Sequence, residues 1–111
     1  MGNVPRNGFA GNAIFGAFNA SAGGDTPLVA AVPGARIRVI AVVVVATLAN
    51  SVHFRSAATP ITASFPLAAN GGFVLPVNEL GWFETAVGEA LAVNMSAATA
   101  TGLQVIYAIV R

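Results

Sequence analysis

Residues 35–49 read Ala-Arg-Ile-Arg-Val-Ile-Ala-Val-Val-Val-Val-Ala-Thr-Leu-Ala, and this stretch decides the fold class. It is dominated by valine and isoleucine, β-branched residues that lose side-chain freedom in a helix and favour strands. It is also shorter than the roughly 20 apolar residues that a membrane-spanning helix needs. We therefore expect one long strand with two apolar faces, one formed by Ile37, Val39, Val43 and Val45 and the other by Ile40, Val42, Val44 and Leu48.

A strand that is apolar on both faces requires cover on both sides. A two-sheet sandwich covers one face of each sheet, so the second face of this strand needs a partner subunit or the N-terminal residues 1–24 over it. Arg36 and Arg38 lie on one face at the start of the strand. We interpret them as the point where the strand emerges from its cover.

Short segments with strand-like composition lie on both sides of this stretch, separated by turn residues such as Pro33-Gly34 and Asn70-Gly71-Gly72. About eight antiparallel strands with short connections predict an all-β sandwich of jelly-roll type. Besides the long strand, the expected strands cover residues 28–32, 52–55, 61–65, 73–77, 82–85, 90–96 and 103–110.

Residues 82–91 allow two interpretations. Their apolar side chains have helical spacing, but Gly88 in the middle destabilises a helix by up to about 1 kcal/mol relative to alanine. We favour a strand over residues 82–85, a turn near Gly88 and a new strand from Ala90. A helix over these residues is the alternative.

Residues 1–24 have a composition of their own, rich in glycine, asparagine and alanine. A disordered tail contains few aromatic residues, whereas this zone contains several. We predict an extended N-terminal arm that precedes a sandwich domain over residues 25–111, and that inserts its large apolar side chains into neighbouring subunits. An arm folded back on its own domain is the alternative. The side chains concerned are Phe9, Ile14, Phe15 and Phe18.

The composition favours a subunit of an assembly. Of the 111 residues, 56% are hydrophobic and 8% are charged, whereas a typical soluble domain has about 25% charged residues. Such a chain cannot cover its whole surface with charged side chains, so we expect part of its exterior to be buried against other copies. The expected homo-oligomer is a trimer. A monomer with a neutral surface of small residues is the alternative.

The composition also argues against several classes of protein. A formal net charge of +1 provides no basic field for nucleic acid. The chain has no cysteine, which excludes disulfides, thiolate chemistry and cysteine-based metal sites. A secretory signal has basic residues followed by an apolar run, and the N-terminus of this sequence lacks that pattern. We therefore expect neither a secretory signal nor a membrane partner.

Few side chains are available for catalysis. The chain has one histidine, His53, and the acids Asp25, Glu79, Glu84 and Glu89. A Ser-His-Asp triad built from His53 and Asp25 would need a nucleophile elbow, and the sequence contains none. A single histidine provides no metal-ligand pair, and two separated acids such as Glu84 and Glu89 are weak support for calcium. We predict no enzyme, no metal site and no cofactor.

Several polar and aromatic residues outside the arm are candidates for subunit contacts. Arginine geometry suits carboxylates, so each arginine among these candidates (Arg36, Arg38 and Arg55) is expected to pair with Glu79, Glu84 or Glu89 of another subunit. As solvated surface residues they would each contribute little. On a strand, Trp82 and Phe83 point to opposite sides, so one is expected in the core and one at an interface; both in the core is the alternative. These candidate interface residues are Arg36, Arg38, His53, Arg55 and Trp82.

Three segments together resemble small proteins encoded in tailed-bacteriophage genomes. They are residues 53–56 (His-Phe-Arg-Ser), residues 69–76 (Ala-Asn-Gly-Gly-Phe-Val-Leu-Pro) and residues 81–91, which hold Gly-Trp-Phe-Glu-Thr and Gly-Glu-Ala-Leu. A hydrophobic strand with Tyr107 follows. The resemblance covers residues 35–111 and leaves out the arm. Where the family has a glycine in its first hairpin, this chain has Ala57-Ala58, so this turn is expected to differ.

The resemblance implies a virion protein of jelly-roll type, such as a capsid decoration (cement) protein, located on the phage capsid surface and made in the host cytoplasm. It implies a homo-oligomer that binds the major capsid protein or other virion proteins, without catalysis. A tail, fibre or spike component that recognises a host glycan is the alternative, although loops such as residues 97–102 are short and lack aromatic side chains.

Overall fold

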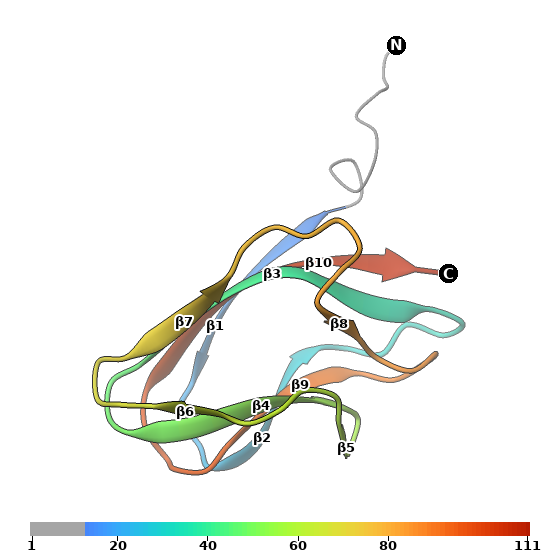
Figure 1. Ribbon diagram of the computed structural model, residues 1–111. Helices are drawn as coiled ribbons and strands as arrows, with labels where there is room; N and C mark the ends of the chain where they lie inside the picture. The colour runs from blue at the N-terminus through green and yellow to red at the C-terminus, as the bar shows by residue number, and fades with distance from the viewer. Residues whose placement is uncertain (1–12) are drawn as a thin grey trace.

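The computed structural model describes residues 13–111, which form two antiparallel β-sheets packed face to face (Figure 1). The predicted all-β sandwich is confirmed at this level. Among these residues no helix is found that is long and apolar enough to cross a membrane. The strands are β1 (Ile14–Ala20), β2 (Gly24–Val29), β3 (Arg36–Ala46), β4 (Asn50–Ser56), β5 (Thr59–Pro60), β6 (Phe65–Leu67), β7 (Gly72–Leu75), β8 (Phe83–Glu84), β9 (Leu91–Met95) and β10 (Thr101–Val110).

The two sheets have five strands each. The first has the order β1-β10-β3-β7, and β8 also pairs with β3; the second has the order β2-β9-β4-β5, and β6 also pairs with β4. The described residues thus form ten strands rather than about eight. The difference arises because Ile14–Ala20, expected in the arm, form β1, and because two short strands, β5 and β6, take the place of the single strand expected over residues 61–65.

Six of the eight strand pairings among the described residues are nested around the turn at Ala57-Ala58, and the other two join β3 to β10 and β4 to β9. The chain therefore follows the path of one long hairpin whose two arms run side by side. Strands β1 to β4 alternate between the sheets, and the later strands retrace this alternation in reverse (Figure 1). From the turn outward, the pairs include Ser51 with Pro66, Val45 with Gly72, Arg38 with Glu84, Pro27 with Ala92 and Phe18 with Leu103.

A β-bulge at Ile40 changes which side of β3 faces the core. Val39 pairs with Tyr107 and Ala41 with Ile106, so Ile40 is the extra residue on β3. An extra residue reverses the alternation of side chains. Ile37 and Val39 point into the core before the bulge, and Val42, Val44 and Ala46 do so after it. The regular alternation predicted for this strand is therefore wrong, and the bulge brings part of each predicted face into one core.

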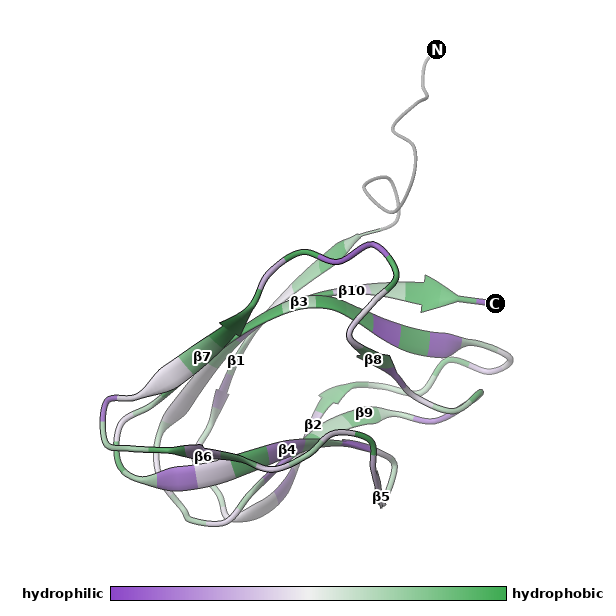
Figure 2. Cartoon of the chain, viewed as in Figure 1, coloured by the Kyte–Doolittle hydropathy of each residue, from purple (hydrophilic) through white to green (hydrophobic). Residues whose placement is uncertain are grey.

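The remaining core residues come from both sheets. Aliphatic side chains of β4, β9 and β10 meet those of β3 between the sheets, and Phe54 packs on Phe83 with ring centroids 4.9 Å apart. In Figure 2, β4 alternates between hydrophilic and hydrophobic residues, as expected for a strand with one wet face. The buried cluster contains Ala20, Ile37, Val39, Val42, Val44, Ala46, Val52, Phe54, Leu67, Leu91, Val93, Met95, Leu103 and Val105.

The segment over residues 82–91 is strand, turn and strand, as favoured from the sequence. β8 is followed by a turn in which Gly88 has φ +74°, a left-handed conformation that glycine adopts without strain, and β9 begins at Leu91. Phe83 packs against the core, while Trp82 is exposed. The prediction that one of these two aromatic residues lies in the core is confirmed.

The predicted boundary at residue 24 does not coincide with the structure. Ile14–Ala20 form strand β1, which pairs with β10 along its whole length, and β2 begins at Gly24. Residues 14–24 thus belong to the sandwich, because their apolar side chains have a sheet of the same chain to pack on. Residues 1–12 of the predicted arm, including Phe9, lie outside the described residues.

Of the strand expected over residues 61–65, residues 61–64 are not in a strand and only Phe65 is, as the first residue of β6. The main-chain N–H of Phe54 donates to the Thr62 hydroxyl (3.0 Å), so a side chain replaces a main-chain partner at this point. The ladder along β4 is interrupted there, and only β5 and β6 on either side are strands.

Candidate functional site

The outer side of the first sheet is apolar over most of its width. Three rows cross it: Phe15, Ile106 and Ala41; Ala17, Gln104, Val43 and Val74; and Asn19, Gly102, Val45 and Gly72. Phe15 is 76% exposed, Val74 60%, Val45 51% and Val43 39%. These rows contain no charged residue. We call this surface, defined by the three rows, the apolar face.

A hollow of about 370 Å³ opens in the apolar face. It lies where Gly102 of β10 stands between Asn19 and Val45, because a residue without a side chain leaves a gap in the row. Nothing lies within 4 Å of the position that a Cβ atom at Gly102 would occupy. Exposed apolar surface with a central recess is typical of protein-binding sites.

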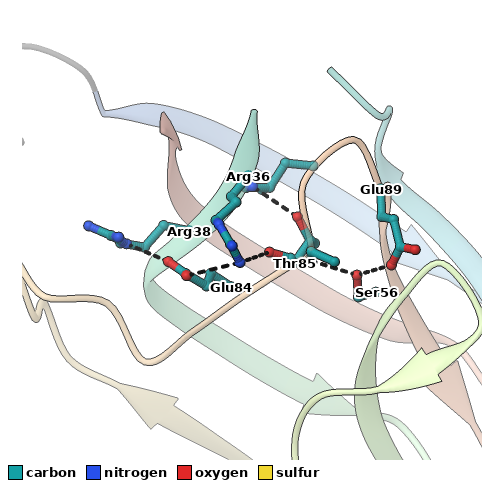
Figure 3. Close-up of polar contacts among 8 residues, drawn as sticks. Arg36, Arg38, Ser56, Glu84, Thr85 and Glu89 are labelled. Atoms are coloured by element: carbon teal, nitrogen blue, oxygen red, sulfur yellow. Dashed lines mark hydrogen bonds and ion pairs between the residues drawn. The ribbon is translucent and has the colours of Figure 1, made fainter. Parts of the chain in front are cut away.

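Charged residues border the apolar face at the start of β3. Arg38 Nε donates to Glu84 Oε1 at 2.9 Å, and Arg36 Nη1 lies 3.5 Å from Glu84 Oε2 (Figure 3). In Figure 2 two hydrophilic bands mark this end of β3. These ion pairs form within one chain, whereas the pairing of Arg36 and Arg38 across subunits stays a prediction. An apolar centre with a polar rim is the usual organisation of a protein interface.

A partly buried polar network next to this rim joins the two sheets. The Ser56 hydroxyl donates to Glu89 Oε1 (2.5 Å) and accepts from the main-chain N–H of Ala86 (2.9 Å) (Figure 3). Ser56 is on β4 in the second sheet, whereas the neighbouring Thr85 binds Ile37 on β3 in the first. The groups of this network are occupied by one another, which indicates a structural role at the end of the sandwich.

The outer side of the second sheet is polar. Asp25, Asn94 and His53 form one row across β2, β9 and β4, and Arg55 lies next to them on β4. Arg55 Nη1 donates to both oxygens of Asp25 (3.1 and 3.2 Å), and Asn94 Nδ2 donates to Oδ1 (2.7 Å). The Asn94 hydrogen bond lowers the pKa of Asp25, and the Arg55 guanidinium adds to this, while partial burial opposes it.

His53 and Asp25 share a row but are not arranged as a catalytic pair. Asn94 stands between them in the sheet, and the Asp25 carboxylate is bound by Asn94 and Arg55. His53 Nε2 is buried without a hydrogen-bond partner among the described residues. Across residues 13–111 no three His, Asp or Glu side chains gather in a group able to hold a metal ion.

The structure separates the described candidate interface residues into five places. Ile14 and Phe15 are exposed on β1, whereas Phe18 packs against the core of its own chain, so its predicted insertion into a neighbour is wrong. The remaining candidates are Arg36 and Arg38 at the rim, His53 and Arg55 on the opposite sheet, and Trp82 in the β7–β8 connection, where its Nε1–H donates to the Pro76 carbonyl.

Sequence reasoning missed Val74, Ala17 and Gly102 as parts of one surface. Val43 and Val45 were predicted from the sequence to lie on an apolar side of the strand that needs cover, and they form part of the apolar face. The pairing of β3 with β7 and β10 was needed to bring the other residues beside them.

The chain was compared with known proteins in three ways. It matches no protein-family model, no curated protein and no solved structure at a significant level.

Proposed function

We propose that this protein is a structural, non-catalytic virion subunit of jelly-roll type, and that it decorates a phage capsid by docking its apolar face on the capsid lattice. The nested pairing of strands, with two sheets of order β1-β10-β3-β7 and β2-β9-β4-β5, supports the jelly-roll assignment, because a jelly roll is a long hairpin wound into two sheets. The sequence segments that resemble phage proteins support the virion assignment.

The observation that carries the docking proposal is the difference between the two outer sides of the sandwich. The outer side of the first sheet exposes Phe15, Val43, Val45 and Val74, while the outer side of the second carries Asp25, Arg55, Asn94 and His53. A small domain exposed to water on both sides has no need for this asymmetry. An uncharged apolar side with a charged rim fits the surface of another protein.

The partner that we propose is the major capsid protein in its assembled shell. A protein that binds only the assembled lattice stabilises it by mass action. Binding to the lattice also accounts for the low charge, because the apolar side is covered on the particle. This role needs no metal, cofactor or reacting group.

The experiment uses shells assembled from the major capsid protein of the virus whose genome encodes this chain. The chain is added to these shells, and both co-sedimentation and the thermal midpoint of shell disassembly are measured. We expect saturable binding and a higher midpoint. Shells that neither bind the chain nor gain stability would contradict the decoration role.

A second candidate function, a glycan-binding component of a tail, fibre or spike, is favoured by the polar side of the second sheet. Carboxylate, amide and guanidinium groups of Asp25, Asn94 and Arg55 form a hydrogen-bonded cluster of donors and acceptors that suits sugar hydroxyls. Specific binding on a glycan array that is lost in Asp25→Ala would favour this function over decoration.

A further inference from the structure

Three of the four sheet edges carry features that prevent the addition of further strands. Strand β2 contains Asp25 and Pro27 and has a register shift after Pro27. Strands β5 and β6 have two and three residues and include Pro60 and Pro66, and β7 and β8 have four and two residues. Charge, proline, irregular pairing and short length are the usual means by which a sheet edge avoids other chains.

Strand β1 has none of these features. Its seven residues, Ile-Phe-Gly-Ala-Phe-Asn-Ala, include no proline and no charge, and it pairs with β10 without a register shift. No strand among residues 13–111 pairs with its other edge. Half of the main-chain N–H and C=O groups of an edge strand point away from the sheet and can bind another strand.

We propose that β1 pairs antiparallel with β1 of a second copy, across a two-fold axis at Ala17. The inference rests on the proposed function, because it identifies one partner of the assembly. With the axis at Ala17 all seven residues are paired, and Phe15 lies opposite Asn19 of the second copy. A different partner strand or a face-to-face contact between copies would be outcomes against it.

Two properties of β1 favour its own copy as the partner. The two-fold axis at Ala17 pairs odd-numbered residues with odd-numbered ones and even-numbered residues with even-numbered ones. Each residue whose main-chain N–H and C=O groups point away from its own sheet therefore lies opposite a residue of the second copy with the same orientation. The strand has no charge, so self-pairing brings no like charges together. The pair would join two apolar faces into one continuous surface, because the outer rows begin on β1.

The test uses two single-cysteine variants, because the chain has no cysteine of its own. In the proposed dimer the two Ala17 Cα atoms lie about 4.5–5.5 Å apart, which is within the range of a disulfide. Val43 occupies the same row two strands further in, so five strand spacings, roughly 24 Å, separate it from its copy. Ala17→Cys should cross-link on mild oxidation, and Val43→Cys serves as the matched control.

We expect Ala17→Cys to migrate mainly as a dimer on a non-reducing gel and Val43→Cys as a monomer. Light scattering of the unmodified chain should show twice its mass of 11.1 kDa, a dimer in place of the trimer expected from the sequence. A monomeric mass for the unmodified chain, or cross-linking of Val43→Cys as strong as that of Ala17→Cys, would overturn the proposal. No capsid shells are present in this experiment, so its failure is distinct from a failure of lattice docking.

Discussion

Ile37 and Thr85 are joined by two hydrogen bonds between β3 and the end of β8. The main-chain N–H of Ile37 donates to the Thr85 hydroxyl (3.0 Å), and the main-chain N–H of Thr85 donates to the Ile37 carbonyl (3.0 Å). Both side chains are fully buried. The threonine side chain therefore acts as a ladder partner at a point where β8 has ended, and it keeps the Ile37 N–H satisfied inside the protein.

Replacing Thr85 by valine keeps the shape and removes the acceptor. A buried N–H without a partner costs about 1–3 kcal/mol, so Thr85→Val should lower the free energy of unfolding by about that amount in urea denaturation. Thr85→Ser keeps the hydroxyl and loses a methyl group, and it should be the milder variant. Equal stability of Thr85→Val and the unmodified protein would show that this hydrogen bond contributes little.

Ala57, in the turn between β4 and β5, has φ +52°. This left-handed conformation is unfavourable by roughly 1–2 kcal/mol for a residue with a Cβ atom. Ala57→Gly removes this strain but gives more freedom to the unfolded chain, so we expect a net stabilisation of about 1 kcal/mol. Ala58→Gly is the control, because Ala58 has no positive φ, and it should destabilise. The opposite order of the two thermal midpoints would argue against the strained turn.

The stability of the protein should depend on the charge of Asp25. Its pKa is lowered in the folded state, chiefly by the Asn94 hydrogen bond, so folding favours the ionised carboxylate. This contribution is complete above the pKa of an unfolded aspartate, about 3.9, and it is lost as the pH falls through the lower folded-state pKa. The effect should be modest, because the side chain is partly exposed.

Asp25→Asn tests this dependence. Urea denaturation of both proteins between pH 2 and pH 7 should show a difference in free energy of unfolding above pH 4 that shrinks as the pH decreases. A difference that stays constant over this range would mean that Asp25 acts through contacts that do not depend on its ionisation.

The sequence was sufficient for the fold class and insufficient for the details of β3. Valine and isoleucine dominate residues 35–49 and predict a strand, because these β-branched residues favour strands over helices. Nothing in a run of similar residues marks Ile40 as the extra one, since the bulge depends on how β10 pairs alongside. The regular faces predicted for this strand were wrong for that reason.

The candidate site could be predicted only in part. Phe15, Arg36 and Arg38 were named from the sequence, and the structure places them on or beside the apolar face. Residues 14–20 were interpreted as part of an arm because residues 1–24 are rich in glycine, asparagine and alanine, whereas β10 provides the pairing that makes them a strand. The partner of Arg38 is 46 residues away at Glu84, and spacing in the sequence carries no signal for such a contact.

The central claim, docking through the apolar face, is tested most directly by two matched valine substitutions. Val45 lies on that face and is 51% exposed; Val87 lies in the turn before β9 and is 52% exposed. Because an unpaired charge is costly in an apolar contact, Val45→Lys should weaken co-sedimentation with capsid shells by tenfold or more, about 1.4 kcal/mol, while Val87→Lys binds as the unmodified chain does. Equal binding of the two variants would contradict the claim.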